Sequence, residues 1–465
     1  MPSPSPPATL YLRRIRIRDM RCFKTLDLSF EQAAGDPRMI TLLLGGNGSG
    51  KSTLLRAIAL GLCQQRETSG LISYLSGDFI RQNKQGALQP EAEIEIHLVD
   101  PAHPERHYST RTIVTRDASG QEITTRTTEP ETFPWSSIFV CGYGVNRGAG
   151  QRESTPTEYQ RADAVRTLFT DDAALLDPEE ILKTLKLATY EADTPEANRR
   201  FDNVIRHLKY LLQLRGAHRI DVTSRHVLIH GLWGSMPFHA LGDGYRGTSG
   251  WLLDLWSRAL LADRLPVTGK PAGIVLIDEI DEHLHPAWQK KIVSLLTKRF
   301  PKIQFVGTTH SVMSIVNCRP DQLFAAELKN TVARLHPLSG PEGKTADYLL
   351  RGEWFGLTST LDDDSEALLR RYQTAVRKSA DETELAPLRD ELRDRIGYLV
   401  ESPLDSLALE IAAETRKRFR RETTPERRRE IIGEAADKLR ERLAYIDSSV
   451  TESPSRTWPG STIDP

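Results

Sequence analysis

Two kinds of apolar pattern recur along this chain. Mainly apolar runs occur at residues 39–44, 137–141, 273–277 and 304–309. Apolar and polar side chains alternate at residues 11–18, 26–30, 92–98 and 108–115. Continuous runs predict strands buried on both faces of a parallel sheet, whereas alternation predicts half-exposed antiparallel strands. The pattern therefore predicts an α/β fold with a mainly parallel core sheet and an antiparallel accessory sheet.

Helical spacing of apolar residues dominates three other stretches, which are residues 178–214, 286–299 and 364–445. Strands that alternate with helices indicate parallel β-α-β connections. The expected organisation is a disordered N-terminus at 1–9, a first α/β lobe with the accessory sheet at 10–150, a helical lid insertion at 151–240, a second α/β lobe at 241–345, a C-terminal helical region at 346–447 and a disordered tail at 448–465. The motifs described below assign a function to the two lobes.

Composition narrows the class of protein but does not choose a function. The chain has 465 residues, 39% of them apolar and 27% charged, with a formal net charge of -1, so any nucleic-acid contact needs a local basic patch. Its four cysteines are scattered without a C-x-x-C pair, which is typical of a reducing compartment. No secretory signal and no run long enough to span a membrane is found, so we expect a cytoplasmic protein without membrane contact.

The run at 39–44 leads into a glycine-rich stretch and then into a helical pattern. Its residues, Gly45-Gly46-Asn47-Gly48-Ser49-Gly50-Lys51-Ser52-Thr53, fit the spacing G-x-x-x-x-G-K-[ST]. Glycines let backbone N–H groups surround a phosphate, Lys51 reaches the outer phosphates, and the Ser52 hydroxyl is placed to bind Mg²⁺. We therefore predict a P-loop that binds ATP and Mg²⁺ through residues 45–53, a range that includes Gly45, Asn47, Gly48, Ser49, Gly50, Lys51, Ser52 and Thr53.

Two carboxylates and a histidine follow later core strands. Asp278 ends the apolar run at 273–277 and is a candidate Mg²⁺ ligand, while the adjacent Glu279 is a candidate base for the attacking water. His310 follows the strand at 304–309, where an imidazole would reach the γ-phosphate. Glu279 and His310 are therefore the expected catalytic residues.

With these motifs in order, the chain resembles the ABC-type ATPases of the SMC/RecF/OLD group. The resemblance covers residues of about 10 to 360, and it includes the turn at 18–23 and a signature stretch at 241–244. In that group two heads enclose two ATP molecules between the P-loop of one subunit and the signature of the other. The resemblance thus implies an ATP-dependent homodimer, with Gly242, Asp243 and Gly244 at the nucleotide of the partner subunit. Gly242 stands where the group usually has serine, which removes a hydroxyl donor.

Sustained heptads for coiled-coil arms are absent, and the armless part of the group includes ATPases of anti-phage systems. The residues Tyr348-Leu349-Leu350 and Trp354-Phe355-Gly356-Leu357 resemble the ends of Septu PtuA and retron-associated ATPases. This resemblance implies a defence ATPase that regulates an effector protein such as an HNH-type nuclease, and it leaves open a higher oligomer beyond the dimer. A RecF-like DNA-binding repair ATPase is the alternative. A transporter subunit is a third reading, against which the C-terminal helices argue.

The C-terminal region carries the strongest charge cluster, with basic runs at 416–421 and 427–429. Its apolar positions, among them Leu404, Leu407 and Ile411, recur at helical spacing. We therefore expect these helices to pack on the core or on another chain, with the arginines at a polar rim. Direct binding of DNA by this region is the alternative that the pattern leaves open.

Overall fold

The computed structural model divides the chain into two compact units, residues 1–357 and 358–465. It describes residues 8–75, 78–83, 85–147, 158–175, 177–214, 216, 218–223, 225–231, 234–240, 242–357, 359–377, 382–396, 411, 415, 427 and 430–438. Each unit is considered separately below.

A six-stranded sheet forms the centre of the first unit, in the order β14-β13-β3-β12-β11-β7. Its strands are β3 (Ile40–Leu44), β7 (Val140–Tyr143), β11 (Gly273–Ile277), β12 (Ile303–Thr308), β13 (Leu323–Lys329) and β14 (Val332–Pro337). All neighbours are parallel except the edge pair β13–β14. Along β3, Leu42 and Leu44 join the apolar cluster on one face and Leu43 joins that on the other. The prediction of a mainly parallel, doubly covered core sheet is confirmed.

The strand expected at 137–141 lies further along the chain. Residues Trp135–Ser137 form a 3-10 turn, and β7 begins only at Val140 and continues to Tyr143, which pairs with Ile277. Gly142, one residue beyond the expected strand, lies inside β7, where a Cβ would stand 2.6 Å from the Leu168 side chain. Glycine is needed there because the segment around Leu168 packs directly on the backbone.

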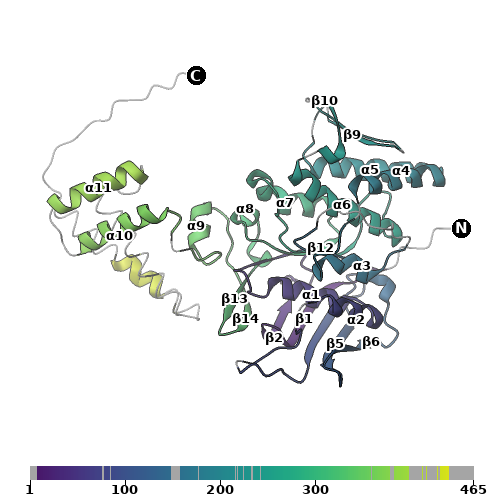
Figure 1. Ribbon diagram of the computed structural model, residues 1–465, viewed down its shortest axis with the longest axis horizontal. Coiled ribbons are helices and arrows are strands. Elements are labelled where there is room, and N and C mark those ends of the chain that lie inside the picture. The colour runs from purple at the N-terminus through teal and green to yellow at the C-terminus, as the bar shows by residue number, and fades with distance from the viewer. Residues whose placement is uncertain are drawn as a thin grey trace. The chain divides into compact units, whose positions relative to one another are not determined.

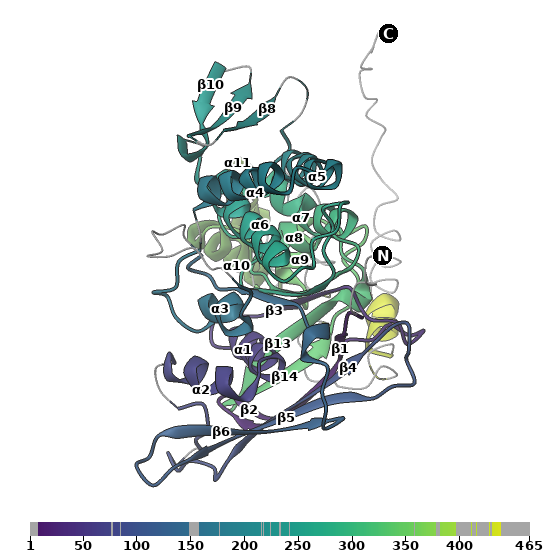
Figure 2. The ribbon, with the colours of Figure 1, turned by 90° about the vertical axis from the view of Figure 1, so that its right-hand side faces the viewer.

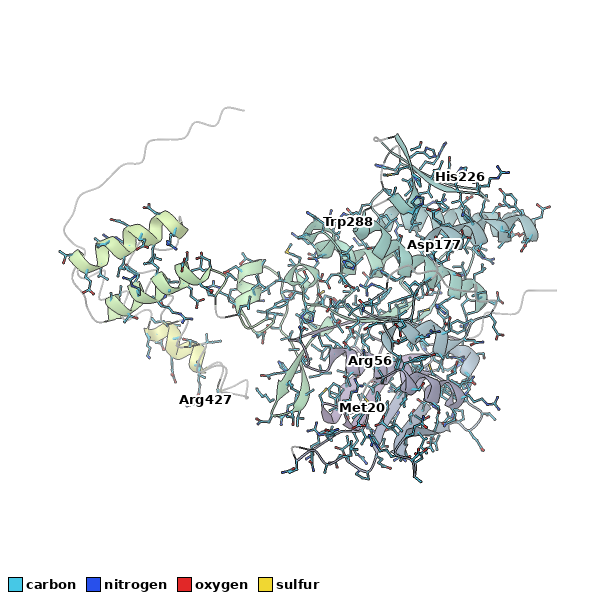
Figure 3. The ribbon with its side chains drawn as sticks, viewed as in Figure 1. Met20, Arg56, Asp177, His226, Trp288 and Arg427 are labelled. Atoms are coloured by element: carbon cyan, nitrogen blue, oxygen red, sulfur yellow. The ribbon has the colours of Figure 1, made fainter. Side chains whose placement is uncertain are left out.

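A five-stranded antiparallel sheet, in the order β2-β1-β4-β5-β6, confirms the predicted accessory sheet. Its strands are β1 (Tyr11–Met20), β2 (Phe23–Ser29), β4 (Ala92–Val99), β5 (Tyr108–Arg116) and β6 (Glu122–Glu129). The buried Gln304 of β12 connects the two sheets, because its amide accepts from Leu12 N at 2.7 Å and donates to Leu12 O at 3.0 Å. Met20, labelled in Figure 3, is fully buried at the end of β1.

Helices cover both faces of the central sheet (Figures 1 and 2). One face carries α1 (Lys51–Leu62) and α2 (Gln65–Ser73), together with the accessory sheet. The other face carries α4 (Pro178–Ala192), α5 (Pro195–Leu211), α6 (Asp243–Leu261) and α7 (Pro286–Arg299). Asp177 caps α4 by accepting from Glu179 N and Glu180 N (Figure 3). Three short helices, α3 (Arg161–Val165), α8 (Val312–Ile315) and α9 (Ala346–Arg351), complete the unit.

The predicted helical insertion also contains a small antiparallel sheet, in the order β10-β9-β8. Its strands are β8 (Arg219–Val222), β9 (Val227–Gly231) and β10 (Gly234–Pro237). The apolar pattern of these three strands is weak. Of their described residues, only Ile220, Val227 and Ile229 are buried and join the core beside the helices. Strands of four or five residues with so few apolar positions give too weak a periodicity to detect.

The second unit contains α10 (Asp363–Arg377) and α11 (Glu382–Ile396). They pack through Leu368, Tyr372 and Leu392. Most of the predicted helical region beyond residue 396 lies outside the described residues, as does its basic cluster apart from Arg427. The same holds for residues 1–7 and 448–465 of the predicted disordered ends. Within the described part, no helix has both the length and the apolar character needed to cross a membrane.

Candidate nucleotide site

The candidate site residues follow four neighbouring parallel strands. The glycine-rich loop follows β3, residues 308–310 end β12 and follow it, Asp278 and Glu279 follow β11, and Arg147 follows β7. Because these strands are parallel and ordered β3-β12-β11-β7, their carboxyl ends share one edge of the sheet. Ligands of open α/β sheets bind at this edge. The topology therefore brings together the loop, the two carboxylates and the histidine predicted from the sequence.

Tight packing at two glycines gives the loop its shape. Gly45 has a φ of 145°, and a Cβ there would stand 2.2 Å from the Ala326 carbonyl oxygen of β13. Gly50 has a φ of 99°, and its Cβ would meet Cys22 and Phe23 within 3 Å. Both positions therefore exclude larger residues. The turn at 18–23, which the sequence grouped with the loop, is the surface on which the loop rests.

The loop ends at an uncapped helix. α1 begins at Lys51, no side chain caps its first turn, and no acidic residue lies there. The hydroxyl of Ser49 is buried and has no hydrogen-bond partner within the described part of the chain. Free N–H groups and an unsatisfied hydroxyl at a helix N-terminus fit a phosphate group. The residues present therefore fit the triphosphate that the motif predicts.

Lys51 is held by the loop itself. Its Nζ donates to the carbonyl oxygens of Gly45 at 2.7 Å and Gly46 at 3.0 Å, and the residue is only 6% exposed. Burial lowers the pKa of Lys51, and the nearby negative charges of Asp278 and Glu279 oppose that shift. A buried ammonium that makes only hydrogen bonds to carbonyl groups is suited to an incoming anion.

Thr308 organises the two carboxylates. Its hydroxyl donates to Asp278 Oδ1 at 2.5 Å and accepts from Glu279 N at 2.8 Å. Asp278 is 5% exposed, and within the described residues no lysine, arginine or histidine lies at ion-pair distance from its carboxylate. A buried carboxylate without a cationic partner is costly unless a cation binds there. The Asp278 carboxylate therefore fits the predicted Mg²⁺, with the partly exposed Ser52 hydroxyl as the second candidate ligand.

Glu279 is oriented by an unusual backbone conformation. Its φ is 48°, in the left-handed region that is uncommon for residues other than glycine. The Glu279 carboxylate lies near the second candidate catalytic residue, since Oε1 is 3.8 Å from His310 Nε2. Both side chains are more than one third exposed, so water and substrate can reach them. The structure thus brings the two predicted catalytic residues together.

Arg147 is a functional candidate to which sequence reasoning assigned no role. It is 6% exposed, and its guanidinium donates to the carbonyl oxygens of Gly144 at 3.1 Å, Asp278 at 2.5 Å and Glu279. Burial lowers its pKa, and Glu282, 3.7 Å away, is the main opposing charge. The arginine therefore holds the backbone on both sides of the strained Glu279 link. The sequence feature that could have identified Arg147 is its position in a glycine-containing stretch directly after a core strand.

A fully buried polar group connects the helix after the signature stretch to the same sheet edge. Tyr143 Oη donates to Asp254 Oδ2 at 3.1 Å, and Arg258 Nε donates to that oxygen at 2.6 Å. Asp254 and Arg258 lie on α6, and the Tyr143 carbonyl accepts from Asp278 N at 2.8 Å. Movement of α6 would therefore act on the strand that holds Asp278.

The signature stretch itself is described only in part. Leu241 lies outside the described residues, and Gly242 is exposed and precedes the first residue of α6. The backbone of Asp243 and Gly244 forms the first turn of this helix. Their contact with a nucleotide on a partner subunit remains a prediction.

A family model described as "AAA domain, putative AbiEii toxin, Type IV TA system" matches residues 40–317. This segment holds β3, the glycine-rich loop, both carboxylates and His310. The chain belongs to this AAA-domain family. The matched segment begins at the first residue of the central strand β3 and covers more than half of the chain.

Two curated relatives carry names that agree with the resemblance. The AAA-domain chain is 25% identical over 389 residues to a Septu protein PtuA of Bacillus mycoides (strain KBAB4), covering 83% of this chain and 50% of that protein. It is 38% identical over 112 residues to a Retron Vc95 probable ATPase of Vibrio cholerae serotype O1 biovar El Tor, covering 24% and 22% of the two chains. The chain thus spans half the length of the first relative and less of the second. The resemblance to Septu and retron ATPases is confirmed.

The solved structures that match the chain include heads of SMC proteins. An SMC head bound to the C-winged helix domain of ScpA matches with a TM-score of 0.46 and 16% identity, covering 71% of this chain and 98% of that one. The SMC head domain from Thermotoga maritima matches with a TM-score of 0.42 and 15% identity, covering 70% and 99%.

Proposed function

We propose that this AAA-domain protein binds and hydrolyses ATP, with Mg²⁺, at the edge of its central sheet. The observation that carries the proposal is the convergence of Lys51, Asp278, Glu279 and His310 on that edge beside an uncapped helix. A phosphate-binding loop alone serves many reactions. A loop, a metal carboxylate and an adjacent base together are the parts that nucleotide hydrolysis needs.

Each side chain has a distinct part in this proposal. Lys51 and the N–H groups of residues 48–53 hold the phosphates, while Ser52 and Asp278 hold the metal. The metal supplies positive charge that stabilises the leaving phosphate oxygens. Glu279 orients the attacking water and takes up its proton, and His310 contacts the terminal phosphate. Thr308 and Arg147 keep the Asp278-Glu279 segment in the required orientation.

The proposal extends to a homodimer, which the position of the signature stretch at the start of α6 supports. Gly242, Asp243 and Gly244 would meet the nucleotide of the partner subunit through backbone N–H groups at the start of α6. ATP would then draw two chains together, and hydrolysis would release them. The Tyr143–Asp254 contact would transmit closure at α6 to the Asp278 segment.

The printed names of the relatives support a biological role. Proteins named for Septu and for retrons match this chain, and the resemblance described above implies a role of such ATPases in anti-phage defence. We therefore propose that ATP-dependent dimerisation regulates an effector protein, a nuclease such as the HNH type. This regulatory role is a proposal for the whole protein. It goes beyond the segment shared with the Septu protein PtuA, because the chain spans half of the length of that relative.

Phosphate release by the purified full chain tests the enzymatic part. Turnover should require both ATP and Mg²⁺, and it should disappear in Glu279→Gln while nucleotide binding persists. Absence of ATP binding by the folded wild-type chain would overturn the assignment. Co-expression with the neighbouring reading frames, followed by purification of the complex, tests the effector part separately.

A further inference from the structure

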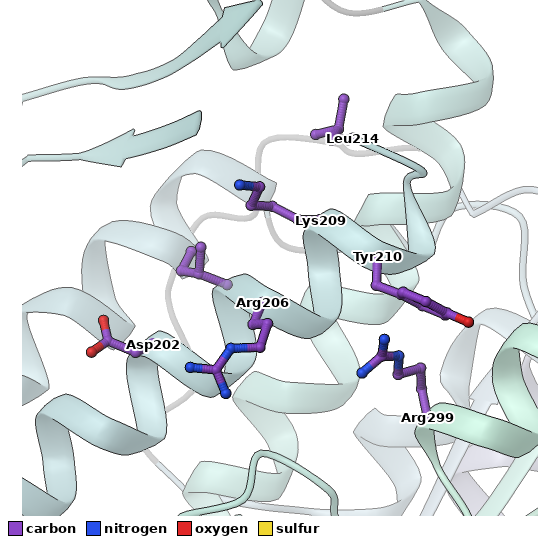
Figure 4. Close-up of a pocket in the computed structure, with 7 residues that line it drawn as sticks. Asp202, Arg206, Lys209, Tyr210, Leu214 and Arg299 are labelled. Atoms are coloured by element: carbon purple, nitrogen blue, oxygen red, sulfur yellow. The ribbon is translucent and has the colours of Figure 1, made fainter. Parts of the chain in front are cut away.

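A groove opens between α5 and the C-terminal end of α7, on the helical face of the sheet opposite α1. Its volume is about 380 Å³, which lies within the range of ligand sites. Three cations line it: Arg206 and Lys209 from α5, and Arg299 from α7. Figure 4 shows Asp202, Arg206, Lys209 and Tyr210 along one helix, with Arg299 reaching the tyrosine ring. Residues of the P-loop do not take part.

Within the described part of the chain, these three cations lack the carboxylate partners that several other basic side chains have. On the accessory sheet, Arg14 pairs with Asp27 at 2.5 Å and Arg18 pairs with Glu93 at 3.2 Å. Within the described residues, by contrast, none of the three groove cations has a carboxylate at ion-pair distance. Lys209 and Arg299 are also partly buried. Partly desolvated cations without a carboxylate at ion-pair distance favour the binding of an anion.

The positive field of the groove acts on a neighbouring histidine. His207 hydrogen-bonds the Thr268 carbonyl at 2.9 Å and lies 3.4 Å from Arg299 Nη1. Burial lowers the pKa of His207, the hydrogen bond to Thr268 opposes this shift, and the charges of Arg299, Lys270 and Arg206 add to the lowering.

Beside these charges the groove offers flat and apolar surface. The guanidinium carbon of Arg299 lies 3.4 Å from the centre of the Tyr210 ring, so this planar cation is held against an aromatic ring. Ile205 and Leu214 complete the lining. Arginine planes and tyrosine rings are the surfaces on which nucleic-acid bases stack. Phosphate and base would thus find matching partners side by side.

We propose that this groove binds a nucleotide at a site separate from the P-loop, with Arg206 and Lys209 at the phosphate and the Arg299–Tyr210 stack at the base. A free nucleotide and a nucleotide within a single strand present the same chemistry. The two sources differ in how many phosphates they offer to the cations along α5.

Binding should be measured in the Lys51→Ala protein, so that the P-loop does not contribute. The probes are AMP, followed by calorimetry, and a labelled oligothymidylate, followed by fluorescence anisotropy. The double variant Arg206→Gln/Lys209→Gln should weaken binding about tenfold or more, since two charge-assisted contacts are lost. For the strand, the slope of log K against log salt should fall by about 1.4, because each phosphate contact contributes about 0.7.

The matched control is Lys290→Gln/Lys291→Gln, which removes two exposed charges from helix α7 outside the groove. Tighter binding of the oligothymidylate than of AMP assigns the groove to a strand, and equal binding assigns it to a free nucleotide. The proposal is overturned if neither probe binds, or if both double variants weaken binding equally. ATP binding by the two double variants with Lys51 intact shows separately whether the P-loop assignment holds.

Discussion

His310 Nε2 lies 3.8 Å from Glu279 Oε1, although the two residues follow different strands of the central sheet. The strands β11 and β12 that precede them are parallel neighbours, with Ile277 paired to Gly307. The distance is longer than a hydrogen bond, so the pair leaves room for adjustment when substrate binds.

Lys51→Ala should abolish ATP binding or lower its affinity severely. The loss removes a charge from the outer phosphates, whereas the loop glycines and the start of α1 remain in place. Binding is measured by equilibrium titration with a fluorescent ATP analogue. Lys24→Ala, an exposed lysine of β2, is the control and should bind as the wild type does. Unchanged ATP turnover in folded Lys51→Ala would falsify the P-loop assignment.

Glu279→Gln and Asp278→Asn should fail in different ways. The first variant keeps the size of the side chain but removes the base, so turnover should fall at least about 100-fold while ATP still binds. Its ATP-bound dimer should accumulate and be visible by light scattering. Asp278→Asn should instead weaken the Mg²⁺-dependent part of ATP binding, since the metal loses a charged ligand. If Glu279→Gln turns over at the native rate, another group activates the water.

Arg147→Lys should lower kcat about 100-fold and leave ATP affinity within about twofold. A lysine cannot bridge the carbonyl groups of Gly144, Asp278 and Glu279 at once, and a small displacement of the base is enough for this loss. Steady-state kinetics together with nucleotide titration separate the two effects. Arg13→Lys on the accessory sheet is the control.

A role of Arg147 in stability alone would lower the melting temperature and impair kcat and ATP binding together. Thermal unfolding of Arg147→Lys must therefore accompany the kinetics. Equal losses in kcat and in affinity would contradict the positioning role.

Gly45→Ala should destabilise the fold by about 2 kcal/mol or more, even without nucleotide. The glycine has a φ of 145°, and a methyl group would collide with the Ala326 carbonyl oxygen. Gly46→Ala is a close control, because a Cβ at the next position meets nothing within 4 Å. Denaturant unfolding of both variants measures the difference. Equal stabilities would show that β13 does not constrain the loop.

Removal of residues 358–465 should leave ATP binding intact but reduce the size of the assembly. All candidate site residues lie in the first unit, so ATP binding should not need the second unit. The deletion begins at residue 358 because a deletion from residue 385 would remove most of α11 and expose Leu368 and Tyr372 of α10. Size-exclusion chromatography with light scattering, with and without ATP, provides the measurement. A truncated chain that keeps its assembly but loses salt-sensitive DNA binding would favour the DNA-repair alternative.

Local patterns predicted much of the catalytic edge. The glycine spacing identified the loop, and continuous apolar runs located β3, β11 and β12, because strands buried on both faces leave a strong signal. The positions of Asp278 and His310 followed from their place directly after those strands. The predicted boundary of β7 was wrong because glycine is uncommon inside strands, so the expected strand ended before Gly142. In the structure Gly142 lies inside β7, where the Leu168 side chain packs on the backbone.

The sequence by itself determined which chemical groups the site contains. Each of these groups directly follows a strand, and the motif or the apolar run that identifies the group lies within a few residues of it. Only the tertiary structure decided how those groups are held. Thr308 reaches Asp278 across thirty positions, and Arg147 reaches Asp278 across more than a hundred. Such contacts depend on the order of strands in the sheet, which no local periodicity records. The cation-lined groove between α5 and α7 likewise forms only when two helices distant in the sequence pack together.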